Sequence, residues 1–387
     1  MHHGEYFRLM TGRDAIVEWL KHSGITAAPS DPGRIAEQIL ASLGGFRRTG
    51  LLADRDTLKL LDEMAKSVRK YADGTEEEFS DRSVDVKRWR DLVARRSAAR
   101  FGYGASLDAF IEANVLRLGI GLVCPNCQKR NWFGIDGLRL ELTCDRCLQT
   151  FAFPQGSLNF QHTPWQYRVI GPYSVPDYAA GAYSTVLALS VFAQRLGGHD
   201  SELTYATGLD LALDDGTRME ADFVFWYRRS KTFGRDVEPA LVFGEAKSFA
   251  AEGLTAEDVA RMRKLAERFP GSFVVFATLK DELSATEKAG IADFAMWGRE
   301  LSPRGAPRTP VIVLTASELF CKWRIDQTWS DLGGMRAALA ESRRHDFDNL
   351  QTFADVTQQV YLGLSDRHAQ FGQASPASAE DSERPRL

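Results

Sequence analysis

The most informative segment of the chain is Ala240-Leu241-Val242-Phe243-Gly244-Glu245-Ala246-Lys247, in which an apolar run ends in a carboxylate and an amine. A short apolar run is typical of a buried strand. Successive side chains of a strand alternate faces, so Glu245 and Lys247 point the same way, about 6.5 to 7 Å apart. If Asp222 approaches from a neighbouring strand, two oxygen ligands can hold Mg²⁺ or Mn²⁺ against a phosphate, beside a lysine that orients or deprotonates water. The pattern predicts metal-dependent phosphodiester hydrolysis.

Length and composition predict a globular protein of two or three domains, with 387 residues and 44% hydrophobic residues. The chain has no apolar run long enough for a membrane span, and its start lacks the apolar core of a signal peptide. We therefore expect a cytoplasmic protein. The net charge of −4 gives no global attraction to nucleic acid, so such binding would need local basic patches.

Four of the five cysteines form two C-x-x-C pairs, Cys124/Cys127 and Cys144/Cys147, separated by sixteen residues. This spacing is typical of a structural zinc site with four thiolate ligands. Disulfides or a thioredoxin-like redox motif are the alternatives, but neither explains two matched pairs in a chain without an export signal. We expect a zinc ribbon over residues 119–156, folded by its metal. Cys321 lies in an apolar stretch and is expected to be a buried thiol.

The remaining regions differ in their periodicity. Residues 1–118 show apolar spacings of three and four and are expected to be helical. Residues 172–325 predict an α/β domain in the order α-β-β-β-α-β-α-β. Its expected elements are a helix over 177–196, strands over 202–213, 217–228 and 240–247, a helix over 255–269, a strand over 272–279, a helix over 284–297 and a strand over 309–314. We expect C-terminal helices over 326–366 and a disordered tail over 372–387.

This order, with Asp222 and Glu245-Ala-Lys247, resembles the PD-(D/E)xK nuclease superfamily over residues 177–315. The resemblance implies a restriction-endonuclease-like α-β-β-β-α-β core. It also implies that Asp222 and Glu245 bind catalytic Mg²⁺ or Mn²⁺, and that Lys247 positions the attacking water.

One departure from the superfamily pattern concerns the first helix of the domain. Many members carry a further glutamate there, but residues 180–194 contain no acidic side chain. Asp177, Glu202 or Asp210 could supply the missing oxygen. Glu220 lies two residues before Asp222 on the same expected strand, so the two side chains would point to the same side. The alternative is that Glu220 is an exposed residue of the hairpin.

Basic side chains suggest where nucleic acid would bind. The helix expected to start at Thr255 brings Arg261 and Lys264 next to the carboxylate strand, and they are the main candidates for phosphate contacts. Ribbon residues are further candidates: Lys129, Arg130, Arg139 and Arg146. The alternative is that the helix residues lie on the solvent side of an amphipathic helix.

The sequence therefore predicts a metal-dependent endonuclease, most simply of DNA, of a kind that resembles bacterial restriction and anti-phage defence effectors with partner proteins. The alternative is a non-catalytic subunit that binds nucleic acid or protein with a degenerate nuclease fold. An RNA nuclease also fits, because the motif does not sense the 2′-hydroxyl. No phosphate-binding P-loop is present in the sequence, so any ATP dependence would need another subunit.

Overall fold

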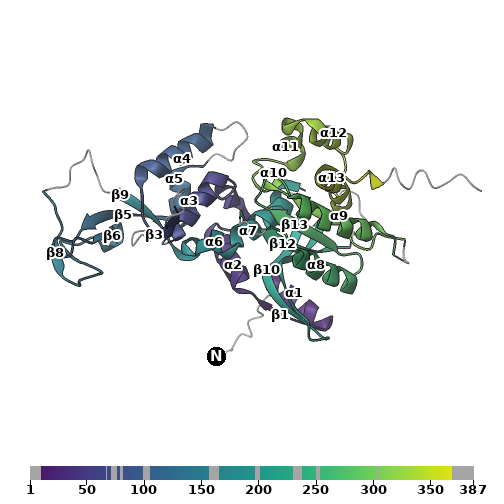
Figure 1. The fold of residues 1–387 in the computed structure, drawn as a ribbon, viewed down its shortest axis with the longest axis horizontal. Helices are drawn as coiled ribbons and strands as arrows, with labels where there is room; N and C mark the ends of the chain where they lie inside the picture. Colours follow the sequence, from purple (N-terminus) through teal and green to yellow (C-terminus); the bar gives the residue numbers. More distant parts are fainter. Residues whose placement is uncertain are drawn as a thin grey trace, which may run out of the picture.

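The computed structural model describes residues 10–66, 68–70, 76–78, 82–98, 105–156, 165–196, 201–229, 238–249, 253–302 and 305–367. The chain is a mixed α/β protein built on a six-stranded sheet (Figure 1). The strand order is β1-β10-β11-β12-β13-β14. These strands are β1 (Ile25–Pro29), β10 (Ser201–Leu213), β11 (Arg218–Arg229), β12 (Ala240–Lys247), β13 (Phe273–Thr278) and β14 (Val311–Leu314).

The sheet is antiparallel from β1 to β12 and parallel from β12 to β14. Helices α8 (Ala256–Arg268) and α9 (Ala285–Arg299) make the crossovers that parallel strands require. The predicted order α-β-β-β-α-β-α-β is confirmed. Each predicted element begins within two residues of its observed start, except the first helix.

Helices cover both faces of the sheet. Phe192 of the π-helical segment η5 (Val191–Leu196) contacts Phe225 of β11, with ring centroids 4.8 Å apart. The next residue of β11, Trp226, contacts Trp19 of α1 (Gly12–His22) at 5.5 Å. Since neighbouring strand residues point to opposite faces, α7 (Ala182–Ser190) with η5 covers one face, and α1 with α8 covers the other.

The predicted helix over 177–196 is wrong at its start. Residues 177–180 all have positive φ, and Asp177 itself has φ 58°. The short segment α6 (Pro176–Ala180) is held by α3 (Arg55–Ala65), because Asp62 accepts a 2.7 Å hydrogen bond from the Tyr178 backbone N–H. Regular helix therefore begins only at α7.

The prediction of a wholly helical N-terminal region is also wrong. Strand β1 lies at the edge of the large sheet, antiparallel to β10. Helix α2 (Asp31–Ser42) begins directly after it, and Gly33 packs on Gly208 of β10. A Cβ on Gly33 would lie 2.2 Å from the Gly208 carbonyl oxygen, so the close approach requires glycine. The end of the N-terminal region is not helical either, because strand β5 (Leu116–Val123) begins soon after the short helix α5 (Leu107–Glu112).

The cysteine-containing segment extends from the rest of the molecule as a β-rich arm (Figure 1). Its first hairpin joins β5 (Leu116–Val123) to β6 (Arg130–Gly134) in a sheet ordered β4-β9-β5-β6, with β4 (Val84–Asp85) and β9 (Trp165–Val169). Helix α4 (Val86–Ala98) follows β4. The second hairpin joins β7 (Glu141–Thr143) to β8 (Thr150–Ala152). Ile120, Leu122 and Leu142 form a separate small core.

The C-terminal helices pack against the β14 end of the sheet through Glu318, which is fully buried in α10 (Ala316–Leu319). Its carboxylate accepts hydrogen bonds from Trp329 Nε1 at 2.7 Å and Tyr361 Oη at 2.5 Å. These residues belong to α11 (Ile325–Leu332) and α13 (Leu350–Leu362), and α12 (Gly334–Ser342) lies between them in sequence. The tail expected to be disordered lies outside the described residues. None of the helices in the described part has the length and apolar character needed to cross a membrane.

Candidate functional site

Asp222 and Glu245 are neighbours on adjacent antiparallel strands. The β11–β12 register pairs Phe223 with Gly244, and its continuation by one residue sets Asp222 opposite Glu245. Directly opposite residues point to the same face of a sheet. Asp222 Oδ2 accepts a 2.6 Å hydrogen bond from the Ala246 backbone N–H, which fixes the carboxylate beside β12. The strands thus place Asp222 and Glu245 side by side. Lys247, two residues after Glu245 on β12, points to the same face.

Burial and like charge act on both carboxylates. Burial raises the pKa of Asp222 well above its usual value, and the nearby Glu245 charge raises it further. The Glu245 side chain is buried, and this burial also raises its pKa. Glu245 Oε2 and Glu220 Oε1 are buried oxygens without a hydrogen-bond partner in the described part of the chain. A cation between these carboxylates would satisfy such oxygens.

A closed ring of ion pairs joins Glu245 to helix α8. Lys247 Nζ lies 2.6 Å from Glu245 Oε1 and 3.2 Å from Asp258 Oδ1. Arg261 Nη2 lies 3.1 Å from Glu245 Oε1 and 2.5 Å from Asp258 Oδ1. Two buried acids and two partly buried bases therefore alternate around the ring. Arg261, predicted to contact nucleic acid, is part of the site itself.

Lys247 is held as an ammonium. Burial lowers its pKa, but the Glu245 and Asp258 carboxylates more than offset this effect, so its pKa lies above the usual value. In this arrangement the side chain can donate hydrogen bonds and orient a water molecule, but it has no free lone pair to accept a proton.

A hollow of about 560 Å³ lies on the same face of the sheet as the carboxylates. Its lining includes Asp210, which the register sets opposite Glu220. Glu220 and Asp222, two residues apart on β11, share that face. The complete lining is Thr26, Ala28, Asp210, Leu211, Ala212, Arg218 and Met219. None of the predicted site residues Asp222, Glu245 and Lys247 lines this hollow.

Three other predicted residues lie elsewhere. Asp177 forms an ion pair with Lys66 of the N-terminal region, and Glu202 pairs with Arg228 across β10 and β11. Neither completes the site in this arrangement. Lys264 Nζ lies 2.8 Å from Asp215 in the β10–β11 turn, so its exposed charge is already paired. Of the three residues considered for the missing oxygen, Asp210 is the one that lies opposite Glu220 in the β10–β11 register.

Asp258 is the site residue that the sequence analysis missed. It is 3% exposed and caps α8, accepting a 2.8 Å hydrogen bond from the Thr255 N–H. The pattern Thr255-Ala-Glu-Asp258 does predict this cap. It does not show that the same carboxylate also reaches Lys247 on β12, because that contact depends on how the helix packs on the sheet.

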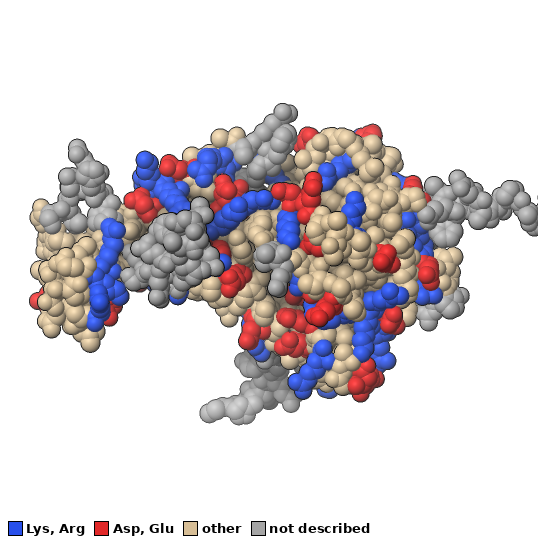
Figure 2. Space-filling model, viewed as in Figure 1, with Lys and Arg blue, Asp and Glu red and all other residues tan. Residues whose placement is uncertain are grey.

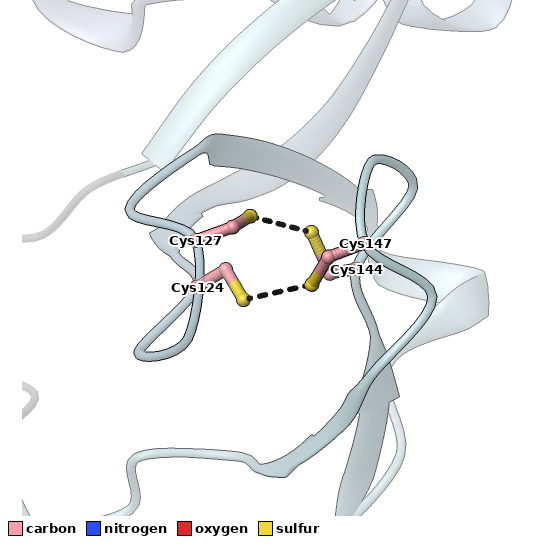
Figure 3. A group of neighbouring side chains, drawn as sticks. All are labelled: Cys124, Cys127, Cys144 and Cys147. Atoms are coloured by element: carbon pink, nitrogen blue, oxygen red, sulfur yellow. Dashed lines mark hydrogen bonds between the residues drawn. The ribbon is translucent and has the colours of Figure 1, made fainter.

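The four predicted zinc ligands converge at the end of the arm (Figure 3). Cys124 Sγ lies 3.7 Å from Cys147 Sγ, and Cys127 Sγ lies 3.5 Å from Cys144 Sγ. All four sulfur atoms lie within 4.8 Å of one another and could hold a metal ion. No three carboxylates in the described ranges converge as closely.

The two cysteine loops have matching backbones, which explains the convergence. The Gln128 N–H donates to the Cys124 carbonyl, and the Leu148 N–H donates to the Cys144 carbonyl, both at 3.0 Å. Gln128 and Leu148 both have positive φ, at 59° and 57°. Backbone N–H groups, first that of Cys147 and then that of Arg146, lower the pKa of the Cys144 thiol to about 6. The Gln149 N–H likewise lowers the pKa of Cys147. The Lys129 N–H acts in the same direction on Cys127, but burial and the neighbouring thiols outweigh it and raise the pKa of Cys127 to about 11.

No protein-family model, curated protein or solved structure matches the chain.

Proposed function

We propose that the chain is a metal-dependent nuclease with a PD-(D/E)xK site formed by Asp222, Glu245 and Lys247. The observation that carries the proposal is the hydrogen bond from the Ala246 N–H to Asp222, which fixes one acid beside the strand that bears the other two residues. The order of strands and helices around this pair, α-β-β-β-α-β, also fits a restriction-endonuclease-like core.

The site residues fit a divalent cation. Asp222 and Glu245 would hold Mg²⁺ or Mn²⁺, and the unpartnered Glu245 Oε2 and Glu220 Oε1 provide further oxygens nearby. A bound cation neutralises phosphate charge and lowers the pKa of its water. Lys247 would orient the water that attacks phosphorus. The proton of that water would pass to solvent, and the leaving oxygen would take up a proton from solvent as its bond to phosphorus breaks. Arg261 and Asp258 hold Lys247 and Glu245 in register.

The arm is proposed to be a zinc ribbon that positions the substrate or a partner. Four thiolates around one zinc, at about 2.3 Å each, place the sulfur atoms about 3.8 Å apart, close to the observed separations. Arg130, Arg139 and Arg146 are exposed, and no ion pair engages them in the described residues. Figure 2 shows basic and acidic side chains interspersed over one face, so phosphate binding would depend on such local groups.

The alternative function is a non-catalytic binding subunit, and the ion-pair ring favours it. Lys247 and Arg261 already neutralise the charges of Glu245 and Asp258 without a metal, as in a structural ion-pair cluster. The two functions differ in one property. A nuclease site exchanges part of this ring for a cation, whereas a structural cluster has no need of one.

The experiment that tests the proposal is incubation of the purified protein with supercoiled plasmid, linear duplex DNA, single-stranded DNA and RNA. Each substrate is tested with Mg²⁺, with Mn²⁺ and with EDTA. Cleavage of any substrate that requires the cation supports the nuclease and identifies its substrate class. If the protein binds nucleic acid but cleaves none of the four substrates, the result supports a non-catalytic binding subunit. A role in anti-phage defence with partner proteins remains a prediction from the resemblance.

A further inference from the structure

A second site lies away from the strand carboxylates, where three separate parts of the chain meet. A pocket of about 320 Å³ opens between the 3-10 helix η1 (Phe46–Leu51), the segment η5 and the connection from α10 to α11. Its lining residues are Arg47, Gly50, Gln194, Arg195, Lys322, Trp323, Arg324 and Gln327. Four of these side chains are cationic and none is acidic. The volume is at the lower end of the range for small-molecule sites.

Arg195 is the buried cation of this pocket. It is 5% exposed, and its described hydrogen bonds all use Nη1, which donates to the Leu319 carbonyl at 2.9 Å and lies 3.9 Å from Cys321 Sγ. No carboxylate among the described residues forms an ion pair with Arg195, Arg47 or Lys322. A buried guanidinium without a counter-ion is costly, and a bound anion would offset that cost.

An aromatic side chain stands beside these cations. Trp323 is 63% exposed, which is unusual for such a large apolar group. The ammonium of its neighbour Lys322 lies 5.1 Å from the centre of its ring. Exposed tryptophan next to basic groups is the combination that stacks a nucleobase while cations bind its phosphate.

We propose that this pocket binds a nucleoside phosphate. Arg195, Arg47 and Lys322 bind the phosphate, and Trp323 stacks on the base. The phosphate can belong to a free nucleotide or to the 5′ end of a nucleic-acid strand, which present the same groups. The proposal does not depend on the nuclease site, because the two sites share no lining residue.

Calorimetric titration of the full chain, in buffer without Mg²⁺ or Mn²⁺, tests the proposal. The probes are AMP, ATP, inorganic phosphate, and a dinucleotide with either a 5′-phosphate or a 5′-hydroxyl. We expect AMP or ATP to bind more tightly than inorganic phosphate. Tighter binding of the 5′-phosphorylated dinucleotide than of AMP assigns the pocket to nucleic-acid ends, and the reverse order assigns it to free nucleotides.

Three variants locate the binding. Lys322→Glu should weaken binding about tenfold or more, because it replaces a phosphate-binding cation by a carboxylate. Trp323→Ala should reduce the affinity for AMP towards that for inorganic phosphate. The matched control is Lys288→Glu, a reversal of an exposed charge on α9 that lies outside the pocket lining. All three positions lie at the surface or partly so, and thermal melting verifies folding.

Three results would overturn the proposal. The first is the absence of binding by every phosphate-bearing probe. The second is binding that Lys322→Glu leaves unchanged, or that Lys288→Glu weakens to the same extent. The third is that neither AMP nor ATP binds more tightly than inorganic phosphate, which would show that the pocket does not recognise the base.

Discussion

Asp222 Oδ2 accepts a hydrogen bond from the Ala246 backbone N–H at a distance of 2.6 Å. The regular β11–β12 ladder ends at the pair Phe223 and Gly244, so this carboxylate takes the place of the next backbone acceptor. The contact holds a carboxylate beside Glu245 although the two like charges repel each other. Beyond the pair Phe223 and Gly244 the β11–β12 ladder no longer continues, and Asp222 and Glu245 lie on the same face of the sheet.

The first prediction concerns Asp222→Asn in protein without a divalent cation. Asparagine keeps an oxygen for the Ala246 N–H but has no carboxyl group to ionise. The pKa of Asp222 is raised in the folded protein, so folded chains bind more protons than unfolded ones between the two pKa values. The free energy of unfolding of the wild type therefore falls as the pH rises through this window.

We expect Asp222→Asn to remove that loss. At neutral pH the variant should be more stable than the wild type by about 1 kcal/mol or more, and the advantage should shrink towards pH 4. Urea unfolding at several pH values measures the difference. A constant difference at every pH would show that Asp222 is not the titrating group.

The second prediction compares two basic residues of α8. Arg261→Ala leaves buried Glu245 and Asp258 with Lys247 as their one remaining ring cation. Because Arg261 is itself 33% exposed, solvent screening reduces the loss to about 1 to 3 kcal/mol. Lys264→Ala removes an exposed pair with Asp215 and should cost clearly less than Arg261→Ala, because solvent screens an exposed pair. Equal losses in urea unfolding would contradict the description of the ring.

The third prediction is that the purified protein carries one tightly bound zinc per chain at Cys124, Cys127, Cys144 and Cys147. Elemental analysis should give about one zinc for each chain. Cys144→Ser should lose the metal and unfold the arm first, because its small core of Ile120, Leu122 and Leu142 cannot replace the metal. Hydrogen exchange over residues 119–156 measures this. Well under one zinc in the wild type would refute the assignment.

The fourth prediction tests the packing of helix α2, which follows the N-terminal strand, against β10 of the sheet. Gly33→Ala should destabilise the protein by about 2 kcal/mol or more, since its Cβ would lie 2.2 Å from the rigid Gly208 carbonyl. The control is Gly137→Ala, where a Cβ would meet no atom within 4 Å. Helix propensity alone would make Gly33→Ala favourable. A gain in stability would therefore exclude the close packing of α2 on β10.

The sequence predicts the parts of this fold that local patterns encode. Strand β12 was predicted with its observed bounds, because an apolar run that ends in charge marks a buried strand. The cysteine spacing likewise predicts the cluster, since the matching loops are a local property of each C-x-x-C pair.

The features of the fold and of the site that the sequence does not predict depend on tertiary contacts. Residues 25–29 contain no strong strand pattern, and their place beside β10 is fixed by pairing with a strand about 180 residues later in the chain. The left-handed turn at Asp177 depends on Asp62, which lies in another helix. In the site, the ring around Glu245 depends on the packing of α8 against β12.

The most direct test of the central claim is the rate of nucleic-acid cleavage by the wild type and by Asp222→Asn, with and without Mg²⁺ or Mn²⁺. The variant keeps the hydrogen bond to Ala246, so a loss of activity reports on the charge that binds the cation. We predict that the wild type cleaves only with the cation, and that Asp222→Asn is slower by about a thousandfold with an unchanged fold and zinc content. Cation-dependent cleavage by Asp222→Asn at the wild-type rate would contradict the proposed site.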